Sequence, residues 1–320
     1  MARCHGFMRW LLFALAICGA GSWHGSGQPA GDGQKPEEYT IRTTSRLVLL
    51  DVSVKDPAGG LVSGLTQQNF QVYENGKPQQ ITDFAHADIP VTVGLVVDES
   101  GSMRPKQPDV ITAAIAFIHA SNPMDEIFVI NFNEKARRGL PEMIPFSDDV
   151  EQLRAALWQG KPEGRTAVYD ALEMALHHLD FGRRDKKTLV LISDGGDNIS
   201  AHKLPDVMHD VLNSLATIYT IGIFDEDDPD ANPGVLNQIA RLSGGNAYFP
   251  KNLKEITPIC REIAKDIRTR YTIGYVPAEE NRVSERHIKV LARSPNGQKL
   301  VVRTRTSYLF SPDPEEAHAK

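Results

Sequence analysis

The stretch that decides the fold is VTVGLVVDESGSM, residues 91–103. Its first seven residues are apolar apart from Thr92 and Gly94, a run typical of a strand that is buried on both faces of a parallel sheet. The run ends in Asp98, Ser100 and Ser102, so that a carboxylate and two hydroxyls recur at alternate positions. A tight turn would explain this ending, and so would a cation site.

The chain around this stretch alternates between strands and helices. VTVGLVV, EIFVINF, KTLVLIS, TIYTIGIF and NAYF have the composition of buried strands, and helical patterns such as VITAAIAFIHA and AVYDALEMALHHL separate them. Nearly continuous apolar strands separated by helices are typical of a doubly wound, mostly parallel sheet. The sequence therefore predicts a Rossmann-like α/β domain over residues 89–270.

Both flanks of this domain have β patterns. Residues 39–88 contain LVLLDVSVKD and an Asn75-Gly76 pair between alternating runs, which is a strong hairpin signal. Residues 271–311 contain RYTIGYVPA, RHIKVLARS and KLVVRTRTSYLF, with a turn at 295–297. We expect one small β-sandwich assembled from both flanks, with the α/β domain inserted between them; two separate β appendages are the alternative.

The remaining segments indicate export. WLLFALAICGA is too short to span a membrane and is typical of a signal peptide, here residues 1–20, followed by a Gly/Ser/Pro-rich linker at 21–38. We expect a periplasmic or extracellular protein with no membrane span in the mature chain and a disordered tail at 312–320. A lipid anchor at Cys18 is the weaker alternative, because Ile17 is bulky for that motif. A net charge of −6 without a basic block argues against nucleic acid as a partner.

Three polar clusters follow strands or precede a helix at the expected ligand-binding edge of the sheet. Asp98, Ser100 and Ser102 form the first, Thr166 belongs to the second, GRT at 164–166, and Asp194 to the third, SDG at 193–195. These two carboxylates and three hydroxyls are hard oxygen donors, which suit Mg²⁺, Mn²⁺ or Ca²⁺ and not zinc or copper. Hydroxyl ligands would leave much of the metal's charge uncompensated, so an acidic side chain of a partner would be attracted to it.

DESGSM, GRTAVYDAL and LISDGGDN together resemble the von Willebrand factor type A domain and its metal-ion-dependent adhesion site. The resemblance covers residues 90–270. It implies Mg²⁺ or Mn²⁺ rather than Ca²⁺, with Ser100 and Ser102 as direct ligands, Asp98 and Asp194 holding metal-bound waters, and Thr166 in either role. The flanks, NFQVYENGKPQ and YTIGYVP among them, resemble an acidobacterial-type subgroup of exported proteins that carry this domain.

The sequence analysis leads to an exported, metal-dependent protein-binding module without catalytic activity of its own. A metal-assisted phosphatase or peptidase is the first alternative, for which only Glu99 or Asp197 is placed to act as a base. A scaffold with a fold-stabilising metal is the second. The chain has neither a Gly-x-Ser-x-Gly elbow nor a phosphate-binding loop. The acidic run at 225–230 is interpreted as a solvated loop.

Overall fold

The computed structural model describes residues 47–311, except residue 195, residues 226–230 and residues 279–282. The expected signal peptide, the linker and the C-terminal tail lie outside the described residues, as do residues 39–46 of the N-terminal β region. Among the residues that are described, no helix is both long and apolar enough to cross a membrane.

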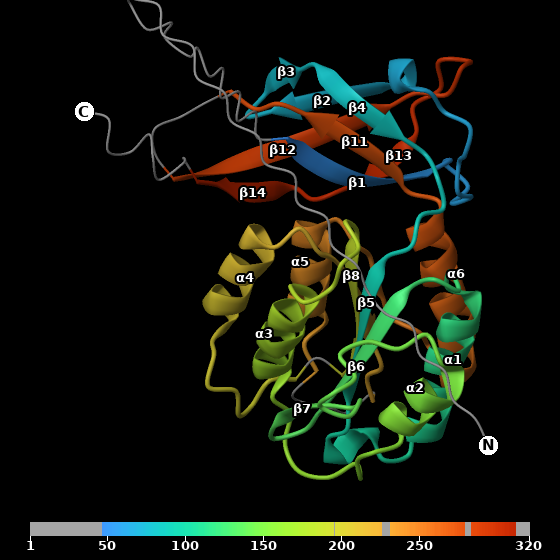
Figure 1. Cartoon of the computed structure of the whole chain (residues 1–320), viewed down its shortest axis with the longest axis vertical. Helices are drawn as coiled ribbons and strands as arrows, with labels where there is room; N and C mark the ends of the chain where they lie inside the picture. The colour runs from blue at the N-terminus through green and yellow to red at the C-terminus, as the bar shows by residue number, and fades with distance from the viewer. Residues whose placement is uncertain (1–46, 195, 226–230, 279–282, 312–320) are drawn as a thin grey trace, which may run out of the picture. The chain divides into compact units, whose positions relative to one another are not determined.

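A six-stranded sheet forms the centre of the middle region (Figure 1). Its order is β10-β9-β8-β5-β6-β7, and all neighbouring pairs are parallel except β6 and β7. The strands are β5 (Thr92–Asp98), β6 (Glu126–Phe132), β7 (Ala136–Arg138), β8 (Lys187–Ser193), β9 (Thr217–Gly222) and β10 (Ala247–Tyr248). The strand order reverses at β5, which has β6 on one side and β8 on the other. Ligand sites in such sheets form at this switch point, beyond the carboxyl ends of the strands.

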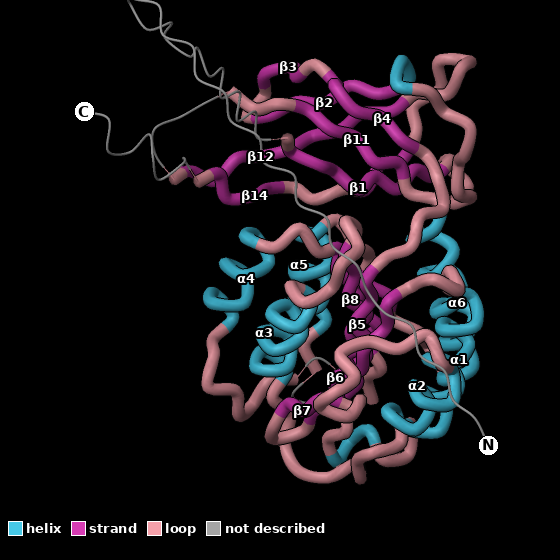
Figure 2. Tube along the Cα trace, in the orientation of Figure 1, coloured by secondary structure: helices cyan, strands magenta, loops and turns pink. Residues whose placement is uncertain are grey.

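Helices cover both faces of this sheet (Figures 1 and 2). On one face, α1 packs against both α2 and α6, and on the other α4 packs against both α3 and α5. The helices are α1 (Gln107–Ala120), α2 (Val150–Leu157), α3 (Val168–Leu179), α4 (Leu204–Asn213), α5 (Pro233–Ser243) and α6 (Ile256–Arg268). Every residue of β5 is buried, which is why the strand is apolar between Thr92 at its start and Asp98 at its end. The predicted doubly wound α/β fold is confirmed.

The flanking segments form two antiparallel four-stranded sheets, β13-β1-β11-β4 and β14-β12-β2-β3. One apolar core contains side chains of both sheets, so they form a sandwich. The first four strands precede the α/β domain and the last four follow it, as predicted for an inserted domain. The bounds are β1 (Val48–Lys55), β2 (Phe70–Glu74), β3 (Lys77–Gln79), β4 (Ile81–Ala85), β11 (Tyr271–Tyr275), β12 (Ser284–Ala292), β13 (Val301–Arg303) and β14 (Ser307–Phe310).

The two predicted turns of the sandwich differ in outcome. Asn75 and Gly76 both have positive φ and join β2 to β3, as expected for a tight hairpin. The turn at 295–297 also forms, but the strand pairing beside it is limited to an isolated bridge between Arg293 and Lys299 and does not extend into a hairpin. β12 and β13 then separate into different sheets, because β13 pairs with β1 while β12 pairs with β2 and β14.

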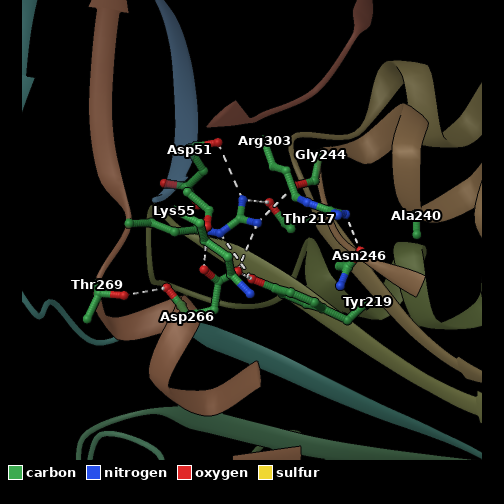
Figure 3. Close-up of polar contacts among 12 residues, drawn as sticks. Asp51, Lys55, Thr217, Tyr219, Ala240, Gly244, Asn246, Asp266, Thr269 and Arg303 are labelled. Atoms are coloured by element: carbon green, nitrogen blue, oxygen red, sulfur yellow. Dashed lines mark hydrogen bonds and ion pairs between the residues drawn. The ribbon is translucent and has the colours of Figure 1, made fainter. Parts of the chain in front are cut away.

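A buried polar network joins the sandwich to the α/β domain (Figure 3). Asp266 of α6 accepts hydrogen bonds from Ser53 of β1 and from Tyr219 of β9. Arg270, just after α6, pairs with Asp266 at 3.4 Å and donates to the Gly244 carbonyl at 2.8 Å. The charged members are almost fully buried, so they can be stable only when paired with one another. The network therefore ties α6 and β9 to the first strand of the sandwich.

Candidate metal centre

The five expected donor residues lie on three loops at the switch point. The first loop, residues 98–103, follows β5 and continues into a single 3₁₀ turn, Gly101–Met103. The second loop, residues 162–167, precedes α3. The third loop, residues 193–198 apart from the undescribed residue 195, follows β8. Parallel strands β5 and β8 are neighbours, so their carboxyl ends bring the first and third loops together.

Hydrogen bonds connect four of the five donor residues into one cluster. Ser100 Oγ and Ser102 Oγ lie 3.1 Å apart, and Ser102 Oγ donates to Asp194 Oδ2 at 2.5 Å. Asp98 Oδ1 accepts from the Ser100 N–H at 2.7 Å, and Asp98 Oδ2 accepts from Ser193 Oγ at 2.6 Å. The alternate spacing thus brings Asp98, Ser100 and Ser102 together in the first loop, and the pairing of β5 with β8 brings Asp194 to them from the third loop.

Thr166, the fifth residue, is held next to the cluster by backbone contacts of its loop. The Gly101 N–H donates to the Gly164 carbonyl at 3.1 Å, which joins the first loop to the second. The Thr166 N–H donates to Asn198 Oδ1 at 3.0 Å, and the Asn198 N–H donates to the Thr166 carbonyl at 3.1 Å, which joins the second loop to the third. With the bond from Ser102 to Asp194, each loop is bonded to both others.

Burial and charge make the cluster suited to a cation. Asp98 is 1% exposed and Asp194 is 3% exposed. Burial, and then the charge of Asp194, raise the pKa of Asp98 to about 7, although hydrogen bonds from Ser193 and Ser100 oppose this. Two neighbouring buried carboxylates repel each other, and a divalent cation between them would remove that repulsion. The donor set therefore fits Mg²⁺ or Mn²⁺.

Hydroxyl donors distinguish this cluster from a site built on acids and imidazoles. Within the described residues, no group of three or more His, Cys, Asp or Glu side chains is placed to hold a metal ion. The acidic run at 225–230 lies outside the described residues except for Asp225, which pairs with Lys106 Nζ at 2.9 Å.

Glu99, expected to stand outside the donor set, has a structural role that its sequence context did not reveal. Its side chain is fully buried and forms an ion pair with Arg137 of β7. Burial raises the pKa of Glu99, an effect that the charge of Arg137 opposes. A methyl group on Gly160 would collide with the ends of both side chains of this pair, so a larger residue there would have to displace them. Sequence spacing could not identify this pair, because the partners are 38 residues apart.

Asp197 is also engaged in local structure. Its Oδ2 accepts from the Tyr169 N–H in the first turn of α3 at 3.1 Å and from Ser200 Oγ at 2.5 Å. These bonds join the third loop to the start of α3, directly after the second loop. Asp197 thus supports the arrangement of the loops, and its carboxylate is occupied.

The comparison with known families bears on this part of the chain. A family model described as von Willebrand factor type A domain matches residues 93–196, a range that contains all five donor residues. Residues 93–196 match the type A domain. The match begins in β5 and ends in the third loop, so the matched range includes the first and second loops and the start of the third.

Individual proteins that resemble this chain have low sequence identity to it. The chain is 27% identical over 184 residues to an uncharacterized protein of Synechocystis sp., covering 55% of this chain and 41% of that protein, so it spans about two fifths of that relative's length. A von Willebrand factor type A structure from Catenulispora acidiphila has a TM-score of 0.49 at 15% identity, covering 79% of this chain and 76% of that one. The vWF domain of a type V pilus tip protein of Porphyromonas gingivalis has a TM-score of 0.48 at 15% identity, covering 56% and 95%.

Proposed function

We propose that this protein is an exported binding module whose type A domain holds Mg²⁺ or Mn²⁺ through Asp98, Ser100, Ser102, Thr166 and Asp194. A protein partner would supply an Asp or Glu carboxylate to the same ion. The observation that carries the proposal is the convergence of two buried carboxylates and two hydroxyls, linked by hydrogen bonds, at the switch point of the sheet.

The chain's own residues define the chemistry of such a site. Asp98 and Asp194 supply the negative charge, and Ser100, Ser102 and Thr166 supply neutral oxygens. When bound, the ion would act as a Lewis acid that attracts a carboxylate. If Asp98 and Asp194 act through bound waters and the neutral hydroxyls are the direct ligands, the ion would keep positive charge for an acidic partner.

The arrangement of neighbouring acids argues against metal-assisted hydrolysis. A hydrolase of this kind needs a base with a free oxygen near the metal. Glu99 is fully buried and paired with Arg137, and Asp197 is bonded to Tyr169 and Ser200. Asp197 is therefore committed to local structure. Glu99 pairs with Arg137 through Oε2, and its Oε1, which has no partner among the described residues, is closed off by burial. We propose no catalytic residue.

Metal binding is tested by isothermal titration calorimetry, in which protein stripped of metal with a chelator is titrated with Mg²⁺ and Mn²⁺. We expect one site, lost in Asp194→Asn and weakened in Ser102→Ala, which removes only a half-buried hydroxyl. The control is Asp148→Asn, an exposed acid before α2. Equal Mg²⁺ binding by all four proteins would reject the site.

Partner recognition is tested on an array of peptides in which each Asp or Glu has an Asn or Gln counterpart. We expect binding to acidic peptides in Mg²⁺, no binding to the amide counterparts, and no binding of either set in EDTA. Binding that survives both EDTA and Ser102→Ala would favour the alternative in which the metal only stabilises the fold.

A further inference from the structure

A cavity lies at the edge of the parallel sheet opposite the metal loops, where the strands begin. It has a volume of about 150 Å³ and is enclosed by β1, β4 and β11 of the sandwich and by the residues that precede β8 and β9. The metal loops follow the ends of β5 and β8, so the two sites are at opposite ends of the same strands.

Large apolar side chains surround this cavity and remain in contact with solvent. Leu49, Ile89 and Leu215 all line it, and their side chains are 38%, 39% and 62% exposed. Scattered exposed leucines are ordinary, but three that converge on one cavity form an apolar surface that a ligand could cover.

The same cavity is lined by a buried cation with unused hydrogen-bonding capacity. Arg305 is 5% exposed, its Nη2 donates to the Ser214 carbonyl, and its Nη1 has no hydrogen-bond partner among the described residues. Burial lowers the pKa of Arg305 to about 10, which shows that nearby charge compensates its desolvation only in part. A buried cation in this state is stabilised by an added anion.

The other charged groups of the cavity are placed differently. Lys186 Nζ pairs with Asp51 Oδ1 at 3.2 Å, and the charge of Asp51 also offsets part of the cost of burying Arg305, whose Nη1 is still without a partner among the described residues. Asp185 also lines the cavity but is exposed, where water screens its charge. Arg305 is therefore the group to which an incoming anion would bind.

We propose that this cavity binds a small monocarboxylate with an apolar body, its carboxylate on Arg305 and its body against Leu49, Ile89 and Leu215. A cavity of about 150 Å³ accommodates a molecule of the size of benzene. The fitting ligands are thus aromatic or short-chain aliphatic acids of about eight or nine non-hydrogen atoms.

Isothermal titration with benzoate and hexanoate tests this inference, with benzyl alcohol and hexanol as uncharged counterparts. We expect the acids to bind at least tenfold more tightly than the alcohols, since an added charge-assisted hydrogen bond is worth about 1.5 to 3 kcal/mol. Arg305→Gln should remove this preference. The inference would be overturned if the acids and the alcohols bound equally well. It would also be overturned if the acids did not bind at a ligand concentration on the order of 10 mM.

A second pair of variants keeps the test decisive if Arg305→Gln does not fold. Leu215→Asp places a negative charge at the mouth of the cavity, whereas Phe181→Asp changes an equally exposed side chain, also 62%, that does not line it. We expect Leu215→Asp to lower the affinity for benzoate at least tenfold and Phe181→Asp to bind benzoate as tightly as the wild type does. Unchanged benzoate affinity in Leu215→Asp would refute the assigned position.

Discussion

The buried pair of Asp266 and Arg270 allows a quantitative prediction about how the two halves of the protein are joined. Asp266→Asn keeps the shape of the side chain and removes its charge, which leaves Arg270 as a buried cation. At 3.4 Å and an effective dielectric constant of about 20, the lost attraction is about 5 kcal/mol. Breaking a buried pair in this way generally destabilises a protein by about 3 to 5 kcal/mol.

The measurement is urea unfolding followed by circular dichroism, with Asp148→Asn as the exposed control. We expect the free energy of unfolding to fall by about 3 to 5 kcal/mol in Asp266→Asn and by less than about 0.5 kcal/mol in the control. The double variant Asp266→Asn, Arg270→Met should lose less stability than the two single variants together, because it also removes the orphaned charge. A loss below about 1 kcal/mol, or additive losses, would refute the reasoning.

The pH dependence of this pair has a definite sign. Burial alone would raise the pKa of Asp266, but the charge of Arg270 and hydrogen bonds from Ser53 and Tyr219 outweigh burial, so the pKa is lowered. A lowered carboxyl pKa adds stability above the unfolded value of about 3.8, and this contribution is lost as the pH falls through the folded value. The stability gap between wild type and Asp266→Asn should therefore narrow below pH of about 4.

Further predictions concern packing, protonation and loop position. Gly160→Ala should cost about 1 to 3 kcal/mol in urea unfolding, because its methyl group would strike a buried ion pair, whereas Gly234→Ala, where the methyl group finds ordinary contacts, should cost nothing. Burial raises the pKa of Asp125 to about 6, so relative to Asp125→Asn the wild type should lose stability as the pH rises from about 4 to 7; the opposite slope would contradict this. Asn198→Ala should weaken Mg²⁺ binding in calorimetry about fivefold to tenfold by releasing Thr166, and unchanged affinity would show that this bond is dispensable.

The α/β fold could be predicted because its parallel strands are largely apolar and helical patterns separate them. The short edge strand β7, Ala136–Arg138, carries two arginines and could not be recognised in this way. The position of the donor residues followed from the same reasoning, since Asp98 and Asp194 stand directly after buried strands. The sandwich was predictable as β structure, with one hairpin fixed by Asn75-Gly76. Its sheet order was not, because nothing local indicates that β13 leaves β12 to pair with β1.

Contacts between distant residues were the part that the sequence could not provide. Gly164 joins two of the loops through its backbone carbonyl, a group that every residue type carries, and Asn198 joins the second loop to the third through its N–H and its side-chain oxygen, with a partner 32 residues away. Ser53 and Asp266 are 213 residues apart, and no spacing rule connects them. Arg305 lies in a segment with alternating basic residues, a pattern that a solvated strand would also have, so its burial depends on tertiary packing alone.

The insertion of the α/β domain also determines how the molecule would carry mechanical load. β4 ends at Ala85 and β11 begins at Tyr271, and these strands pair side by side, with Ala85 opposite Thr272. A pull on a partner at the metal edge would reach the sandwich through two adjacent connections and run along both strands. Hydrogen bonds of an antiparallel pair lie across the strands. Because both connections leave this pair at the same end, the force would pull β4 and β11 in the same direction and would not shear the bonds between them. The load would fall instead on the hydrogen bonds that join β11 to β1.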